Sequence, residues 1–114
     1  MRSFRVVEAW HAAYEDPIVL KAGEEFWLSD KTDNWDGHLW LWARNQAGKE
    51  GWIPDSLVRR SAGRTYATIG FSATELTCRN GEVLTASLEL NGWALCQAAG
   101  GSIGWVPLRN LYAL

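Results

Sequence analysis

A fifteen-residue pattern occurs twice in this chain, and it constrains the fold more than any other feature of the sequence. Residues 40–54 read WLWARNQAGKEGWIP, and residues 93–107 read WALCQAAGGSIGWVP, 53 residues later. The matched positions are Trp40 with Trp93, Gly48 with Gly101, Gly51 with Gly104, Trp52 with Trp105, and Pro54 with Pro107. A repeat of this kind predicts two copies of one small structural unit in tandem.

The length of the chain fits two small domains. Its 114 residues leave about 55 to 60 for each copy, and a unit of that size buries only about 60% of its unfolded surface. Such a unit needs large apolar side chains or a neighbouring unit, and the chain contains eight tryptophans. We therefore expect a first domain at residues 1–60 and a second at 61–114, joined by a linker at 59–63 and packed against each other.

Short β-forming segments separated by turn residues dominate both copies. Residues 4–10, 24–29 and 39–45 are rich in β-branched, aromatic or alternating apolar residues, which is typical of strands. Asn91 and Gly92 form the strongest two-residue hairpin signal in the chain. No segment has the period of a helix, so the sequence predicts an all-β fold of two small barrels with five strands each.

The charge of the chain argues against nucleic acid and membranes as partners. The formal net charge is −2, so no basic field attracts a phosphate backbone or an anionic lipid surface. No apolar run approaches the roughly 18 residues of a membrane-spanning helix, and the N-terminal residues lack the apolar core of a signal peptide. These features predict a cytoplasmic protein that binds neither nucleic acid nor a membrane.

The sequence contains no residues with the spacing of a metal, cofactor or catalytic site. His11 and His38 have no ligand partner at a fixed spacing, so we expect no metal. A phosphate-binding loop and a nucleophile motif are also missing, which predicts a protein without a cofactor that is not an enzyme. Cys78 and Cys96 lack C-x-x-C spacing, so we expect buried free thiols, with a disulfide as the alternative.

The order of the predicted elements resembles the SH3 domain. In both copies a strand and a long loop precede a Gly-Glu pair, a second strand and a Trp, and Gly-Trp-x-Pro follows. Both copies look like bacterial variant SH3 domains, and the resemblance, which covers nearly the whole chain, implies two SH3-like barrels in tandem. By this resemblance the RT loops are residues 11–22 and 69–80, the n-Src loops 30–37 and 90–92, and the distal hairpins 46–49 and 98–102.

The resemblance also implies a function, because SH3 domains bind proline-rich peptides in the polyproline II conformation. An aromatic groove between the RT and n-Src loops holds the proline rings, and acidic groups pair with a ligand Arg or Lys. Carried over to the first copy, the groove comprises Trp10, Tyr14, Glu15, Asp16, Trp35, Asp36, Trp40 and Pro54. We therefore predict a non-enzymatic interaction module that binds a Pro-containing or basic peptide segment of a partner protein.

The second copy keeps fewer of these groups. Trp93 and Pro107 match the groove, and we expect them either to bind a ligand or to pack against the first copy. Trp52 and Trp105 are expected to pack inside their barrels. By the same resemblance, Leu57 stands in the place of the family's groove tyrosine, and Leu111 follows its proline one residue later than Leu57 does.

Two other functions stay open at this point. Aromatic planes also suit the faces of sugar rings, and bacterial SH3-like domains often bind cell-wall glycans. The second alternative is a structural or regulatory subunit that docks on a larger partner through its Trp-rich surface. A homodimer formed through the Trp-bearing faces is a further alternative.

Overall fold

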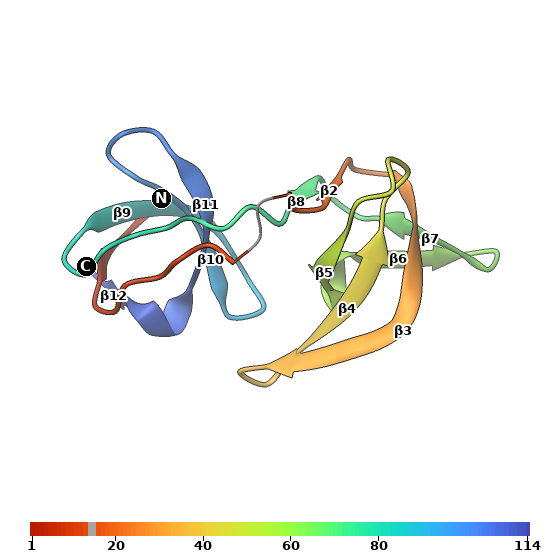
Figure 1. The fold of residues 1–114 in the computed structure, drawn as a ribbon, viewed down its shortest axis with the longest axis horizontal. Coiled ribbons are helices and arrows are strands. Elements are labelled where there is room, and N and C mark those ends of the chain that lie inside the picture. Colours follow the sequence, from red (N-terminus) through yellow and green to blue (C-terminus); the bar gives the residue numbers. More distant parts are fainter. Residues whose placement is uncertain (14–15) are drawn as a thin grey trace. The chain divides into compact units, whose positions relative to one another are not determined.

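The computed structural model of the chain describes residues 1–13 and 16–114 (Figure 1). Within these residues it contains twelve β-strands and two three-residue 3₁₀ turns, and no α-helix. The expected all-β class is therefore confirmed. In the same described residues, no helix has the length and apolar character that crossing a membrane requires.

Contacts between residues divide the chain into two compact units. Unit 1 comprises Met1–Glu15 and Thr74–Leu114, and unit 2 comprises Asp16–Ala73. The chain therefore leaves unit 1 once and returns to it once, so that unit 1 is assembled from both ends of the sequence. This division differs from the sequential one after residue 60 that the repeat predicts.

Unit 1 contains a five-stranded antiparallel sheet in the order β11-β10-β9-β1-β12. Its elements are β1 (Arg2–Val6), β9 (Val83–Leu90), β10 (Trp93–Gln97), β11 (Ile103–Pro107), the 3₁₀ turn η2 (Leu108–Asn110) and β12 (Leu111–Ala113). A turn at Asn91 and Gly92 joins β9 to β10, and both residues have positive φ, 48° and 83°. The predicted Asn-Gly hairpin is therefore confirmed, because this turn type needs positive φ at both positions.

Unit 2 repeats this sheet in the order β5-β4-β3-β7-β6. Its elements are β3 (Glu25–Trp35), β4 (His38–Arg44), β5 (Glu50–Pro54), the 3₁₀ turn η1 (Asp55–Leu57), β6 (Val58–Ser61) and β7 (Arg64–Ala67). A separate two-stranded pair joins β2 (Val19–Leu20) to β8 (Phe71–Ser72). The long β3–β4 hairpin extends beyond the rest of its sheet (Figure 1).

Each sheet takes its first strand from the other sequence copy. β1 comes from the first copy, and it pairs with β9 through Phe4 and Leu84 and with β12 through Val6 and Leu111. β7 comes from the start of the second copy, and it pairs with β3 and β6 of the first copy. The two copies have thus exchanged their first strands within one chain.

The short connection between β6 and β7 explains this exchange. The residues expected to form a linker instead belong to a hairpin, whose turn residues Ala62 and Gly63 have φ of 52° and 76°. The first and last strands of this fold lie side by side, as β1 and β12 do in unit 1. A two-residue connection folds the chain back along the strand that it leaves, so β7 takes the place next to β6.

Both units have an apolar core, and the returning arm of the RT loop packs against it through Leu76 and Cys78 in unit 1 and Ile18 and Leu20 in unit 2. The unit 1 core consists of Phe4, Val6, Leu76, Cys78, Leu84, Ala86, Ala94, Cys96 and Val106. A Cβ atom on Gly104 would lie 2.6 Å from the backbone of Glu75 and Leu76, and one on Gly51 would lie 2.9 Å from Cγ2 of Ile18. The glycine of each Gly-Trp-x-Pro motif is therefore required because the returning arm crosses the strand in direct contact.

The two cysteines lie in the unit 1 core as free thiols, as the sequence predicts. Cys78 is 2% exposed and Cys96 is 1% exposed. Burial raises the pKa of Cys78, and it raises the pKa of Cys96 from 9.0 to about 11, because a buried thiolate loses its hydration. Thiols of this kind form little thiolate near neutral pH.

Candidate functional site

Two tryptophans from different sequence copies meet in unit 1. The rings of Trp10 and Trp93 have centroids 5.4 Å apart and planes 85° apart, an edge-to-face contact, and both side chains are half-buried. Oε1 of Glu75 accepts hydrogen bonds from Nε1 of Trp10 at 3.0 Å and from the Ala13 N–H at 3.3 Å. Pro107 is buried and pairs with Trp93 across β10 and β11. We call Trp10, Glu75, Trp93 and Pro107 the Trp10–Trp93 site.

Backbone and side-chain hydrogen bonds fix the arm that carries Trp10. The Trp10 N–H donates to the Cys78 carbonyl at 3.0 Å, and the Cys78 N–H donates back to the Trp10 carbonyl at 2.9 Å. Nδ2 of Asn110, which is 3% exposed, donates to the carbonyls of Glu8 and Ala9 at 3.1 and 3.3 Å. Leaving such a buried amide unpaired costs about 1–3 kcal/mol, so Asn110 holds this arm against η2.

Asn110, rather than Leu111, matches Leu57 of the first copy. Leu57 ends η1 and Asn110 ends η2, and each 3₁₀ turn has three residues. Leu111 instead begins β12 and pairs with Val6, just as Val58 begins β6. The second copy therefore has a buried amide, Asn110, at the position where the first copy has the buried Leu57.

In unit 2, Trp40 and Trp35 lie on the β3–β4 hairpin. Trp40 is half-buried and pairs with the buried Pro54 across β4 and β5. Trp35 ends β3, and the turn that follows it contains the exposed Asp36 with φ of 49° and Gly37 with φ of 82°. Residues 30–35, expected to be loop, therefore continue the strand, because an Asp-Gly turn needs only two residues.

The place of Trp10 is taken in unit 2 by a smaller, buried ring. Phe71 pairs with Leu20 in the β2–β8 pair, and Trp10 pairs with Cys78, the residue that matches Leu20 in the repeat. Phe71 is 7% exposed, so it offers little ring surface to a ligand. Asp16 is exposed, and its Oδ1 lies 2.6 Å from Nζ of Lys49. Unit 2 therefore has no open indole at the position that Trp10 occupies in unit 1.

The residues predicted to form one groove in the first copy are divided between the two units. Trp10 lies in unit 1, together with Trp93 and Pro107, which the repeat assigns to the second copy. The groove residues that lie in unit 2 are Asp16, Trp35, Asp36, Trp40 and Pro54. Tyr14 and Glu15 lie outside the residues that the structure describes.

A cluster of aromatic and cationic side chains on unit 2 was not among the predicted site residues. The rings of Trp42 and Trp52 lie 5.1 Å apart in an edge-to-face contact. Nζ of Lys31 lies 4.1 Å from the centroid of Trp42 and 5.5 Å from that of Trp52, within the range of a cation–π interaction. Trp52 is only half-buried, whereas Trp105 is 6% exposed and packs inside unit 1 as expected.

The described side chains offer ring faces and single charged groups that could bind a ligand. Among residues 1–13 and 16–114, no group of three or more His, Cys, Asp or Glu side chains could hold a metal ion. The Trp10–Trp93 site combines two partly exposed indoles with a fixed carboxylate. It is therefore the strongest candidate for ligand binding among the predicted residues.

A family model described as Variant SH3 domain matches residues 3–60 of the chain. The match spans more than half of the 114 residues and follows the first sequence copy. The matched segment contributes to both compact units, because its first strand, β1, lies in unit 1. Neither a curated protein nor a solved structure matches the chain.

Proposed function

The chain belongs to the variant SH3 domain family, and on this premise we propose that it binds a short peptide segment of a partner protein through the Trp10–Trp93 site. Domains of this family are, in general, protein-interaction modules rather than catalysts. The observation that carries the proposal is the edge-to-face contact of Trp10 and Trp93 beside Glu75. The peptide that suits this site contains proline, a basic residue, or both.

Two indoles set nearly perpendicular to each other suit the side chain of a proline. The pyrrolidine ring is rigid, and a polyproline II segment is already extended, so little conformational entropy is lost on binding. Trp10 and Trp93 each keep part of their surface exposed, so one indole can cover a face of the ring and the other can contact its edge. This arrangement favours proline over flexible aliphatic residues of similar size.

Glu75 supplies a carboxylate that is fixed before a ligand arrives. The indole N–H of Trp10 and the N–H of Ala13 both donate to its Oε1. A fixed carboxylate pairs with a ligand Arg or Lys at a lower entropic cost than a mobile one. We expect the affinity to fall as salt is added, because an exposed ion pair is screened.

The exchange of first strands makes this site depend on both sequence copies. Trp10 comes from the first copy, whereas Glu75, Trp93 and Pro107 come from the second. A fragment of residues 61–114 would lack both Trp10 and β1. We therefore expect the full chain to bind and this fragment to fail.

A titration followed by NMR tests the proposal on the full chain. The probe is a synthetic peptide with an Arg followed by Pro-x-x-Pro, and its control has Ala at the Arg and Pro positions. We expect the indole N–H signals of Trp10 and Trp93 to shift, and Trp93→Ala to weaken binding at least about tenfold, as loss of a central aromatic contact does. Trp27→Ala, which removes an exposed tryptophan of unit 2, is the matched control and should leave the affinity unchanged.

Two results would count against this proposal. If the Trp40 signal shifts while those of Trp10 and Trp93 do not, the ligand binds the Trp40–Pro54 face of unit 2 instead. If the Ala-substituted peptide produces the same shifts with the same affinity, recognition of proline and of a basic group is wrong. Correlation spectra of each variant establish that its fold is intact.

A further inference from the structure

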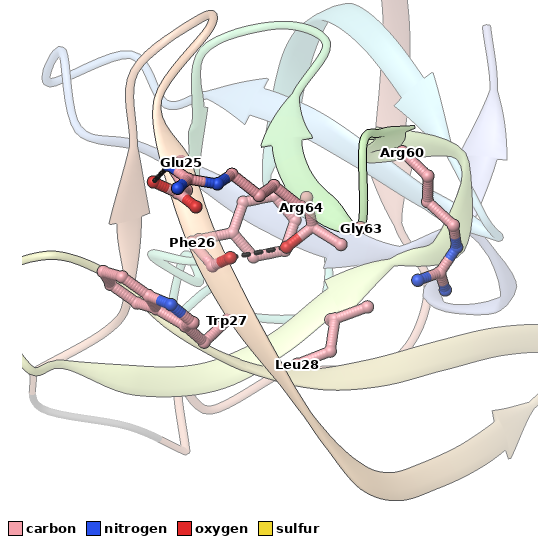
Figure 2. Close-up of a pocket in the computed structure, with 8 residues that line it drawn as sticks. Glu25, Phe26, Trp27, Leu28, Arg60, Gly63 and Arg64 are labelled. Atoms are coloured by element: carbon pink, nitrogen blue, oxygen red, sulfur yellow. Dashed lines mark hydrogen bonds and ion pairs between the residues drawn. The ribbon is translucent and has the colours of Figure 1, made fainter.

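A hollow of about 610 Å³ opens on unit 2 between β3 and the β6–β7 hairpin (Figure 2). Phe26, Trp27 and Leu28 of β3 line it, together with Arg60, Arg64 and Thr65 of the hairpin. Phe26 is 1% exposed and Trp27 is 44% exposed. Leu28 lies at the centre of the hollow, Trp27 and the Arg64 guanidinium beside Glu25 lie on one side, and Arg60 lies on the other (Figure 2). None of these residues belongs to the Trp10–Trp93 site.

The hollow lies where unit 1 has a strand. In unit 1, β1 pairs with β9 over four residues, from Arg5 back to Arg2. In unit 2, the pairing of β7 with β3 covers two residues and ends at Thr65 and Phe26. The pairing ends there because β7 begins at Arg64, directly after the turn at Ala62 and Gly63 that connects it to β6. The two-residue turn that exchanges the strands thus also leaves β3 partly uncovered.

The uncovered positions on β3 are Trp27 and Leu28. Successive residues of a strand direct their backbone N–H and C=O groups to opposite sides, and the Glu24 carbonyl accepts a hydrogen bond from the Ala67 N–H on the β7 side. Leu28, four residues further along, directs its backbone groups to the same side. Within the described residues no strand pairs with Leu28 there. An unpaired strand edge of this kind can accept an added strand.

Basic groups outnumber acidic groups around this edge. Arg60 and Arg64 line the hollow, and Glu25 is the one carboxylate-bearing residue among the described residues that line it. A guanidinium nitrogen of Arg64 lies 3.6 Å from Oε1 of Glu25, and the Arg44 guanidinium packs over the ring of Trp27 at 5.4 Å. In a chain with a net charge of −2, this local excess of guanidinium groups favours a ligand that bears carboxylates.

Arg60 and Arg64 lie on opposite faces of the hairpin. Arg60 pairs directly with Thr65 across β6 and β7, and Arg64 is the neighbour of Thr65 along β7. Paired residues share a face of a sheet and successive residues alternate. A strand added to β3 would therefore find a guanidinium group on each of its two faces, so acidic residues on both faces of that strand have partners.

We propose that this hollow is a second docking site, which binds an extended acidic segment of a partner protein. The segment adds to β3 beside Leu28 through main-chain hydrogen bonds, and its carboxylates bind Arg60 and Arg64. An aliphatic side chain of the segment packs against Leu28, which is half-buried, beside the exposed ring of Trp27. The site lies in unit 2 and prefers the opposite ligand charge to the Trp10–Trp93 site, so it does not depend on the proposed function.

An NMR titration of the full chain with a capped Val-Glu-Glu-Val-Glu-Glu-Val peptide tests this proposal. We expect the Leu28 amide and the Trp27 indole signals to shift, and the affinity to fall as salt rises from about 50 to about 300 mM. Combining Arg60→Gln with Arg64→Gln should weaken binding at least about tenfold. The matched control combines Arg5→Gln with Arg79→Gln in unit 1, which removes the same charge and should leave the affinity unchanged.

Two further probes separate strand addition from attraction by charge alone. A version of the peptide that is N-methylated at alternate residues keeps its carboxylates but loses backbone donors, and we expect it not to shift the Leu28 amide. The capped Val-Gln-Gln-Val-Gln-Gln-Val peptide should bind at least about tenfold more weakly. The single variant Arg60→Gln, at an exposed position, serves if the double variant does not fold, and it should bind more weakly than the unaltered chain.

The proposal is overturned if the arginine variants bind the acidic peptide as well as the unaltered chain does. It is also overturned if the Gln peptide or the N-methylated peptide produces the same shifts with the same affinity. A single-stranded oligothymidine that binds the same residues more tightly would assign the hollow to phosphate groups, and it would equally contradict an acidic protein segment as the occupant.

Discussion

Unit 1 and unit 2 have the same order of strands in their sheets, but they differ in how the first strand begins. In unit 1, β1 is not tied to a hairpin and runs along β9 over four residue pairs. In unit 2, β7 starts from a two-residue turn and runs along β3 over two pairs. One short connection can therefore both exchange the strands of two repeated domains and uncover a strand edge on one of them.

The tryptophans of the repeated motif show the same kind of difference. Trp105 is 6% exposed, and Glu75 of the RT-loop arm forms a strand bridge with it. Trp52, its counterpart, is half-buried and packs against Trp42, whereas Leu95 pairs with Trp105 in unit 1. The same Gly-Trp-x-Pro motif thus holds a buried indole in unit 1 and a half-buried one in unit 2.

Deleting β1 is expected to have the largest effect, and it tests to which unit this strand belongs. Deletion of residues 1–6 takes Phe4 and Val6 from the unit 1 core and leaves a gap between β9 and β12. We expect unit 1 to unfold and unit 2 to stay folded, because unit 2 keeps β7. In a ¹H–¹⁵N correlation spectrum, the Trp93 indole signal should move to its unfolded position while that of Trp40 stays dispersed. The reverse pattern would place β1 in the barrel of the first copy.

The glycines of the two motifs should differ in their tolerance of a methyl group. A Cβ on Gly104 meets rigid backbone of Glu75 and Leu76 at 2.6 Å, whereas a Cβ on Gly51 meets the side chain of Ile18 at 2.9 Å. We expect Gly104→Ala to lower the free energy of unfolding of unit 1 by about 3 kcal/mol, and Gly51→Ala to lower that of unit 2 by about 1 kcal/mol. Urea titrations read at signals of each unit measure both values. Equal losses would mean that both arms yield to the same extent.

Alkaline pH should destabilise unit 1 more than unit 2. The folded-state pKa of Cys96 is about 11 against an ordinary value of 9.0, because burial disfavours the thiolate. Below about pH 9 both states hold the proton and the stability is fully present, and as pH rises toward 11 only the unfolded state loses it. The free energy of unfolding should therefore fall by roughly 2 kcal/mol across this range.

The variant Cys96→Val isolates this contribution. Its unit 1 should show a smaller fall in the free energy of unfolding between about pH 9 and 11 than that of the unaltered chain. Unit 2 contains no cysteine, and its signals in the same urea titrations are the internal reference. The same slope with and without Cys96 would show that other groups cause the alkaline loss.

The smallest expected effect concerns the turn that exchanges the strands. Ala62 has a φ of 52°, a conformation that costs an L-residue other than Asn, Asp or Gly about 1 kcal/mol. Asn91 adopts a similar conformation, with a φ of 48°, at the first position of another two-residue turn, between β9 and β10. We expect Ala62→Asn to raise the free energy of unfolding of unit 2 by about 0.5–1 kcal/mol and to leave unit 1 unchanged. A loss of stability would mean that the turn does not need this conformation.

Local features of the sequence predict the class and much of the detail of the fold. The repeat, the alternation of apolar residues and the Asn91–Gly92 turn are all short-range signals, and each corresponds to an element of the structure. The burial of Cys78 and Cys96 follows from the repeat, because they match Leu20 and Ala43 of the first copy. Periodicity and turn chemistry act within a few residues. They therefore predict individual strands and turns well, but they do not predict which strands pair with each other.

The exchange of strands cannot be predicted from these short-range signals, for a physical reason. β1 and β7 each begin one sequence copy, and local patterns do not indicate that β1 pairs with β9 and β7 with β3. The deciding feature is the turn at Ala62 and Gly63. Ala-Gly is a weak turn signal, because alanine disfavours positive φ, so the sequence predicts a linker at this position instead of a turn.

The candidate site shows the same limit. Trp10 could be predicted as an aromatic wall, but its contact with Trp93 depends on the exchange and has no local signal. The Trp42–Trp52 cluster does have one, because Trp40, Trp42 and Arg44 alternate with apolar residues along β4. Only the burial of Ala43 establishes which of the two faces is turned to the core.

The most direct test of the account is to identify the neighbours of Phe4 in solution. Nuclear Overhauser contacts between backbone protons of paired strands report which strands are adjacent. The exchanged arrangement predicts contacts of Phe4 with Leu84 on one side and Ala113 on the other, together with contacts of Thr65 with Phe26. Contacts between Phe4 and Phe26 would show instead that each copy keeps its own first strand, and they would contradict the central claim.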